Sequence, residues 1–234
     1  MEKASKHFIN RDLLAPNVLE MDIDLDLLAP LSQVCHLLQQ TKLAPGTINI
    51  HNGLQLHAKH PDWPSDIMWI SHREPAGYSY FEELFNRMGI AEAVADRIKY
   101  DCRIVMYGGY FVTRSYCNQS NLHCDWIECD NDAFTFMTPL SANCSELGMT
   151  YRTLRNELGR YDYSLGKGLI FGDHFMHSTA CGTASGTTVF LSFTFGTDRM
   201  TNWAKIGRSA PKQTTFYCQP DGQFVDTTAR FDTV

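Results

Sequence analysis

The hexapeptide NLHCDW, residues 121–126, places a histidine and an aspartate two positions apart. On an extended strand, the side chains of His123 and Asp125 point to the same face. A neutral imidazole and a carboxylate on one face can bind a single metal ion from one side. A short His-x-Asp pattern also arises by chance near turns, so a metal site requires a third ligand elsewhere in the chain.

The segment GLIFGDHFMHSTACG, residues 168–182, supplies two candidates for the third ligand, His174 and His177. Because they lie three positions apart, an extended backbone points them to opposite faces, so only one of them can join the pair without a bend. An antiparallel barrel can return this segment to the side of the His-x-Asp pair. Two imidazoles and one carboxylate, with the opposite side of the ion open, form the ligand set of non-haem Fe(II) oxygenases.

Short runs of β-branched and aromatic residues surround these histidines and predict the strands that position them. The runs are RIVMYGGYFVTRSY, AFTFMTPL, LGMTYRTL, RYDYSL, GLIFG and TTVFLSFTFG, all between residues 103 and 196. Turn-rich segments such as CNQSN and SANCSE separate them. This spacing predicts an antiparallel sandwich or barrel with helices packed outside it, a mainly β protein of the α+β class.

The remaining segments predict helices and a few strands around this core. Residues 25–43 and 78–100 carry apolar residues at helical spacing, with a break at Gly89, and residues 47–51 and 66–71 are typical of strands. The acidic residues 20–26 are expected to form a solvated segment beside the first helix. We expect one domain over residues 1–234, made of a helical and mixed part (1–102), the core (103–196) and a C-terminal extension (197–234).

Composition limits the class of partner. The formal net charge of −6 argues against a nucleic-acid partner, which needs a basic surface. No run approaches the ~18 apolar residues of a membrane span. The first ten residues lack the apolar stretch of a secretory signal, and the eight cysteines form no Cys-x-x-Cys pair. We therefore expect free thiols in a reducing compartment, the cytoplasm.

The order of these motifs resembles that of the Fe(II)- and 2-oxoglutarate-dependent dioxygenases, and is most similar to their phytanoyl-CoA-hydroxylase-like and prolyl-hydroxylase-like branches. A glycine-containing strand, YGGYFVTRSY, precedes the His-x-Asp pair, a strand ending in TPLS follows it, and a GD…HST segment carries the distal histidine. The resemblance covers residues 103–196. It implies a double-stranded β-helix core of the jelly-roll or cupin type.

The resemblance implies that His123, Asp125 and His177 bind Fe(II), because the distal histidine of these families commonly precedes Ser or Thr, as His177 does. It also implies that 2-oxoglutarate is decarboxylated to succinate and carbon dioxide while dioxygen is used to hydroxylate a small-molecule substrate. Two alternatives stay open. One is an oxygenase of the same fold that does not use 2-oxoglutarate, and the other is a non-catalytic metal-binding or sensing module.

The resemblance further implies a cation for the distal carboxylate of 2-oxoglutarate, because burying an unpaired carboxylate is costly. These families commonly place an arginine downstream of the distal histidine, where this chain has Thr187 and Thr188. Arg114, on the strand before the His-x-Asp pair, is therefore our first candidate, and Thr188 is expected to add a hydroxyl. The alternative cations are Arg152, Lys167 and Arg199.

Overall fold

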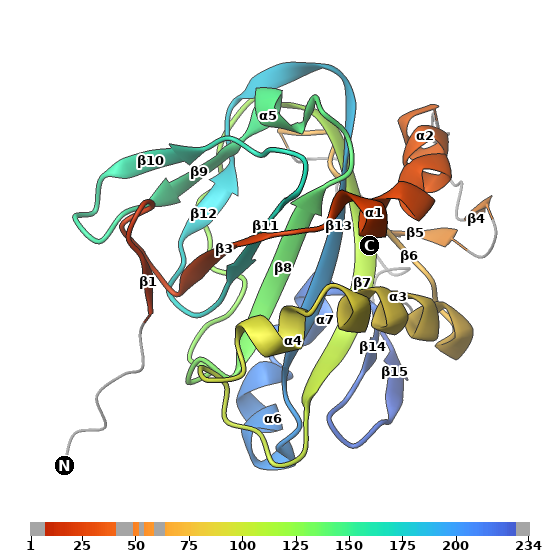
Figure 1. Cartoon of the computed structure of the whole chain (residues 1–234), viewed down its shortest axis with the longest axis vertical. Coiled ribbons are helices and arrows are strands. Elements are labelled where there is room, and N and C mark those ends of the chain that lie inside the picture. The colour runs from red at the N-terminus through yellow and green to blue at the C-terminus, as the bar shows by residue number, and fades with distance from the viewer. Residues whose placement is uncertain (1–7, 41–48, 52–53, 59–63, 228–234) are drawn as a thin grey trace.

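The structure is a computed structural model that describes residues 8–40, 49–51, 54–58 and 64–227. Two antiparallel sheets form its centre (Figure 1). The larger sheet has eight strands in the order β3-β11-β8-β13-β7-β6-β5-β4, and the smaller has three in the order β10-β9-β12. The two sheets lie face to face, so one apolar cluster contains side chains from both.

The strands of the larger sheet include the longest segments of the chain. They are β3 (Val18–Asp22), β4 (Asn49–His51), β5 (Leu54–Ala58), β6 (Met68–Ser71), β7 (Ile104–Cys117), β8 (Ala133–Pro139), β11 (Lys167–Phe171) and β13 (Gly182–Thr197). The smaller sheet consists of β9 (Met149–Arg152), β10 (Leu158–Tyr161) and β12 (His177–Thr179). Two short hairpins are added by β1 (Ile9–Asn10) with β2 (Ala15–Pro16), and by β14 (Phe216–Cys218) with β15 (Phe224–Asp226).

Side chains of β7 alternate between two cores, as expected for a strand buried on both faces. Tyr110 and Val112 pack into the cluster between the two sheets, whereas Phe111 packs into the cluster on the other face of the larger sheet. The same alternation holds on β13, where Phe190 faces the smaller sheet and Phe193 faces away from it. This mainly β architecture with flanking helices confirms the predicted fold class.

Helices cover the outer face of the larger sheet (Figure 1). The predicted break at Gly89 is confirmed, because this glycine has a φ of 66° and separates α3 (Pro75–Arg87) from α4 (Ile90–Ala93). A Cβ on Gly109 of β7 would lie 2.4 Å from Cγ of Phe81, so this glycine permits the close approach of α3 to the sheet. The other helices are α1 (Leu25–Leu28), η1 (Ala29–Leu31), α2 (Ser32–Gln40), α5 (Cys144–Leu147), α6 (Met200–Ile206) and α7 (Ala210–Gln213).

The acidic segment near the N-terminus contains a strand that was not predicted, while its Asp22 carboxylate is solvated as expected. Val18–Asp22 forms β3, which pairs with β11 at one edge of the larger sheet, and Val18 is fully buried. The carboxylates of this strand meet partners across the sheet edge, since Glu20 accepts a hydrogen bond from Tyr161 at 2.7 Å and Asp22 accepts one from Lys167 at 2.5 Å. Strand β5, which was not predicted, links β4 to β6, so the part before residue 102 adds strands to the core sheet.

Two other findings concern the cysteines and the helices. All eight cysteines are free in the structure, as expected for thiols that are not part of a disulfide framework. In the part of the chain that the structure describes, no helix has the length and apolar character needed to cross a membrane.

Candidate metal centre

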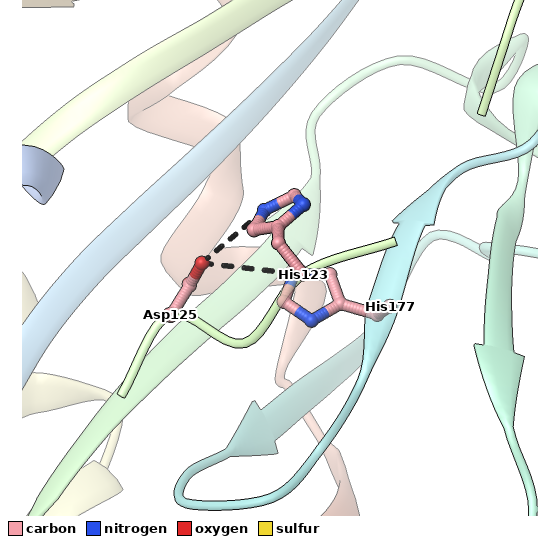
Figure 2. Close-up of side chains that lie close together, drawn as sticks. All are labelled: His123, Asp125 and His177. Atoms are coloured by element: carbon pink, nitrogen blue, oxygen red, sulfur yellow. Dashed lines mark ion pairs between the residues drawn. The ribbon is translucent and has the colours of Figure 1, made fainter. Parts of the chain in front are cut away.

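His123, Asp125 and His177 lie together, with their side chains turned toward one another (Figure 2). His123 and Asp125 come from the connection between β7 and β8, and His177 begins β12. One potential ligand atom from each residue lies within 4.8 Å of the others. Among the described residues, no other three His, Cys, Asp or Glu side chains bring their ligand atoms together in this way.

The His-x-Asp pair does not lie on an extended strand. His123 forms a single isolated β-bridge with His177, and Asp125 lies at a bend of the connecting loop. The amide of each histidine donates to the carbonyl of the other at 2.9 Å. The two imidazoles are therefore neighbours across this bridge, with ring centroids 4.8 Å apart, and the bend turns the Asp125 carboxylate toward them.

Both imidazoles present the same nitrogen to the carboxylate. Nε2 of His123 lies 3.5 Å from Oδ1 of Asp125, and Nε2 of His177 lies 3.8 Å from the same oxygen (Figure 2). Nδ1 of His123 is 2.7 Å from the carbonyl oxygen of Asn121, and Nδ1 of His177 is 3.1 Å from that of Phe175. Because a carbonyl oxygen can only accept, both Nδ1 atoms donate, which leaves the Nε2 lone pairs available to a metal ion.

The pKa shifts agree with a site for a cation. Burial lowers the pKa of His177, so its imidazole is neutral near pH 7. Burial opposes ionisation of Asp125, but the hydrogen bond from His123 and the proximity of both imidazoles outweigh it and lower the pKa of Asp125 to about 2. The hydrogen bond with Asp125 raises the pKa of His123, and a bound cation would replace that proton. Two imidazoles and an ionised carboxylate fit a divalent transition metal.

A cavity of about 560 Å³ opens beside these three residues. Its inner wall is largely apolar and aromatic, with Trp69, Val112, Met137 and Phe171. Its remaining wall includes neutral polar side chains such as Ser65, Gln119, Asn121, Thr179 and Gln213, together with Lys212 from α7. The size and the mixture of apolar walls with few polar groups are typical of sites for small molecules.

Arg114, on β7, lines this cavity and is a buried cation in its wall. Its exposed fraction is only 4%, and its Nε and Nη2 atoms have no hydrogen-bond partner among the described residues. The guanidinium carbon lies 4.6 Å from the ring centroid of Phe190. Burial raises the pKa of the nearby Tyr163 hydroxyl to about 12, while the charge of Arg114 and a hydrogen bond between Arg114 and this hydroxyl oppose that shift. A buried cation with unpaired donors favours an anionic ligand in this part of the cavity.

The other cations considered from the sequence lie elsewhere. Arg199 pairs with Asp101 at 2.7 Å, and Lys167 pairs with Asp22 at 2.5 Å. Arg152 donates from Nη1 to the carbonyl of Asn156 on the protein surface. None of these three is among the residues that line the cavity.

Thr188 and His174 lie outside the cavity wall. Thr188 is fully buried opposite Arg114 in the β13–β7 register, and its hydroxyl donates to the Arg114 carbonyl at 2.7 Å. A direct contact of Thr188 with a ligand therefore stays a prediction. His174 is exposed, has a φ of 68° and does not belong to the triad, whereas His177 is buried within it.

Sequence reasoning missed Thr135 and Tyr110, which also line the cavity. Cys124, between the two candidate ligands of the loop, is half-buried and lines the cavity as well. A signal for Thr135 existed in the run AFTFMTP. Phe134 and Phe136 face the cluster under the helices, so the polar residue between them faces the other side of β8.

Comparison with known proteins supports the fold assignment. No protein-family model and no curated protein matches the chain. Solved structures do match, including the non-heme alpha-ketoglutarate-dependent epimerase SnoN from nogalamycin biosynthesis, with 8% identity, 78% of this chain and 79% of that chain covered, and a TM-score of 0.54.

Two further structures match to a similar extent. AviO1 from Streptomyces viridochromogenes Tue57 has 10% identity over 81% of this chain and 96% of that chain, with a TM-score of 0.53. EctD from S. alaskensis with bound Fe has 12% identity over 78% of this chain and 73% of that chain, with a TM-score of 0.52. At such low identity these likenesses define the fold: the chain shares the double-stranded β-helix fold of the Fe(II)/2-oxoglutarate-dependent oxygenases.

Proposed function

We propose that this protein is an Fe(II)- and 2-oxoglutarate-dependent oxygenase that acts on a small molecule. The observation that carries the proposal is the position of Arg114. A cation that is 4% exposed, with two unpaired donor atoms, lines the same cavity as a His-Asp-His triad. A metal site alone would account for the triad, but it would leave this buried guanidinium without an anion. A dicarboxylate that reaches from the metal to Arg114 accounts for both features.

His123, Asp125 and His177 are the proposed ligands of Fe(II), through Nε2, a carboxylate oxygen and Nε2. When bound, iron and 2-oxoglutarate together would supply the oxidising chemistry that uses dioxygen and releases succinate and carbon dioxide. The contribution of the chain is positional. The paired backbone bonds between His123 and His177 hold the imidazoles side by side, and the Nδ1 bonds to the Asn121 and Phe175 carbonyls orient both rings.

Arg114 is the proposed partner of the distal carboxylate of 2-oxoglutarate. A guanidinium presents its donors in a planar fork that matches a carboxylate, and a charge-assisted bond is roughly twice as strong as a neutral one. The Phe190 ring lies against the guanidinium and restricts where the fork can point, while the bond from Thr188 fixes the Arg114 backbone carbonyl. The Arg114 side chain would thereby orient the co-substrate with its 2-oxo end toward the triad.

The rest of the cavity is the proposed substrate site. Its lining is largely aromatic and aliphatic, with neutral amides and hydroxyls among these side chains. Hydroxylation of a small molecule is the proposed outcome, and the volume of about 560 Å³ is within the range found for sites that bind small molecules.

One experiment separates this proposal from its alternatives. Fe(II) and then 2-oxoglutarate are added to the purified protein without oxygen, and the visible charge-transfer absorption of an Fe(II)–2-oxo acid chelate is recorded. Oxygen is then admitted, and oxygen uptake and succinate formation are measured together. The proposal expects the absorption band and a matched yield of succinate. Uptake of oxygen without 2-oxoglutarate would support an oxygenase of another type, and metal binding with neither result would support a non-catalytic module.

A further inference from the structure

We propose that Thr135 and Trp126 hold Asp125 so that it binds the metal through one oxygen only. The inference deepens the proposed function and rests on its metal site. Asp125 lies at a bend of a loop and not on a strand, so no ladder of backbone bonds fixes its side chain. Its orientation must therefore come from other contacts, and the structure provides a continuous chain of them.

Three side chains form this chain of hydrogen bonds. Nε1 of Trp126 lies 3.0 Å from Oγ1 of Thr135, and Oγ1 of Thr135 lies 2.9 Å from Oδ2 of Asp125. Trp126 is fully buried and Thr135 is 1% exposed, so water does not compete for either bond. Short bonds between buried groups in a dry environment orient their members more strongly than the same bonds at a surface.

The direction of every proton in this chain is determined by chemistry. The indole Nε1–H of Trp126 can only donate, so Oγ1 of Thr135 accepts that bond. A threonine hydroxyl has a single proton, and Thr135 must give it to Oδ2 of Asp125. Oδ2 is therefore occupied as an acceptor and points toward β8. Oδ1 is the oxygen that lies 3.5 Å and 3.8 Å from the two histidine Nε2 atoms, so it is the atom left for a metal ion.

The anchor of this chain is rigid. Trp126 belongs to an apolar cluster with Val105, Tyr107, Ile206 and Ala210, and its ring is fully buried there. Thr135 lies within β8, which is paired on both sides, with β11 and with β13. The Asp125 carboxylate is thus tied to a packed cluster and to the centre of the larger sheet, although its own backbone lies in a loop.

One-oxygen binding by Asp125 has a functional consequence. A carboxylate that bound through both oxygens would occupy an additional coordination position beside the two imidazoles. A 2-oxo acid that chelates the metal needs two adjacent positions, and dioxygen needs another, so the additional bond would compete with one of them. Thr135 and Trp126 are positioning residues in this sense, because they act on the metal through Asp125 and do not touch it.

The test compares metal binding by four proteins: the unmodified chain, Thr135→Val, Thr135→Ser and Thr138→Val. Thr138 is a matched control, because it lies on the same strand, is fully buried and donates its hydroxyl to a backbone carbonyl, that of Lys167. The Kd for Co(II) is measured by competition with a chelator, and the visible spectrum of bound Co(II) reports its coordination. We expect Thr135→Val to weaken binding about 10–100-fold, as is typical when a residue that orients a metal ligand is lost.

Thr135→Ser should bind Co(II) with an affinity within about 3-fold of that of the unmodified chain and should show the same Co(II) spectrum. Thr138→Val should also show the affinity and the spectrum of the unmodified chain. A Thr135→Val protein with unchanged affinity and spectrum would overturn the inference. If Thr135→Val does not fold, Trp126→Phe replaces it, since this change keeps the ring but removes the donor that orients the hydroxyl. Unchanged affinity and spectrum in a folded Trp126→Phe protein would then overturn the inference.

Binding of Co(II) by these variants tests the metal site and the role of Thr135 and Trp126 separately. If the unmodified chain binds no Co(II), or if His177→Ala binds it equally well, the triad is not a metal site and the proposed function is wrong. If the unmodified chain binds Co(II) through the triad and Thr135→Val binds it equally well with the same spectrum, only the role of Thr135 and Trp126 is wrong.

Discussion

The backbone amides of His123 and His177 each donate to the carbonyl of the other residue, at 2.9 Å in both directions. This single bridge joins the loop after β7 to the first residue of β12. Directly opposed residues of an antiparallel pair project their side chains to the same face, so the two imidazoles are adjacent because of the backbone. The positions of the two nitrogen ligands therefore do not depend on a metal ion.

The first prediction concerns the identity of the distal ligand. His177→Ala should abolish metal binding, and His174→Ala should preserve it, because only His177 lies in the triad. A metal at about 100 times its Kd stabilises the folded protein by about 2.7 kcal/mol. For a chain of this size this corresponds to a rise in Tm of roughly 5–10 °C. The rise should occur in the unmodified chain and in His174→Ala and be absent from His177→Ala. The opposite pattern would show that His174 is the distal ligand.

Much of the core could be predicted from the sequence because its strands are long and chemically uniform. β7, β8 and β13 coincide with runs of β-branched and aromatic residues, and these runs face a core on both sides. The break at Gly89 could be predicted because a glycine with positive φ ends a helix in a recognisable way. In these segments local preference and tertiary packing agree.

The missed features depend on contacts between distant segments. β12 has only three residues, His177–Thr179, and is a strand because β9 pairs with it. β3 is a strand because β11 leaves an edge that Val18 and its neighbours can cover. Arg114 could be proposed as a ligand-binding cation from its place on the strand before His123. That its Nε and Nη2 atoms lack hydrogen-bond partners among the described residues became apparent only once the surrounding side chains were placed.

A second prediction concerns stability and pH. Asp198, between β13 and α6, accepts hydrogen bonds from the amides of Asp101, Cys102 and Arg103 at 2.7, 2.7 and 2.9 Å. Its slight burial opposes ionisation, but these amides outweigh it and lower the pKa of Asp198 below its usual 3.8. The ionised carboxylate therefore stabilises the start of β7, and Asp198→Asn should reduce the free energy of unfolding at pH 7 by about 0.5–1 kcal/mol, because these hydrogen bonds are exposed to solvent.

The sign of the pH dependence follows from the direction of this shift. The folded pKa of Asp198 is lower than the unfolded value, so its contribution is complete above about pH 4 and is lost as the pH falls through the folded pKa. Urea unfolding at pH 7 and at pH 3 should show the difference between Asp198→Asn and the unmodified chain shrinking at the lower pH. Asp96→Asn is the control, because its side chain is 79% exposed. A constant difference across this range would contradict the role assigned to the charge.

A third prediction concerns Arg114. Arg114→Met keeps a long apolar side chain over Phe190 but removes the charge, which leaves the distal carboxylate of 2-oxoglutarate without a cation. The concentration of 2-oxoglutarate required for half-maximal succinate formation should rise at least ~10-fold, which corresponds to about 1.4 kcal/mol. The Kd for Co(II) should be nearly unchanged, because Arg114 is not a member of the triad. Arg152→Met, at an arginine outside the cavity, is the matched control and should leave both quantities unchanged.

An unchanged 2-oxoglutarate requirement in a folded Arg114→Met protein would mean that another cation holds the co-substrate. Lys212 is then the next candidate, because it also lines the cavity. Substitution of both cations without any effect would remove the physical basis for a dicarboxylate in this cavity. The oxygenase that works without 2-oxoglutarate would then explain the site better.

The last prediction tests how Thr188 acts. Its hydroxyl donates to the Arg114 carbonyl at 2.7 Å, and it does not line the cavity, so its effect on 2-oxoglutarate should pass through the position of Arg114. Thr188→Val removes this bond to the backbone of Arg114, so the 2-oxoglutarate requirement should rise by less than for Arg114→Met. Thr188→Ser should restore the original requirement. A folded Thr188→Val protein with a defect as large as that of Arg114→Met would instead indicate that the hydroxyl binds the carboxylate directly.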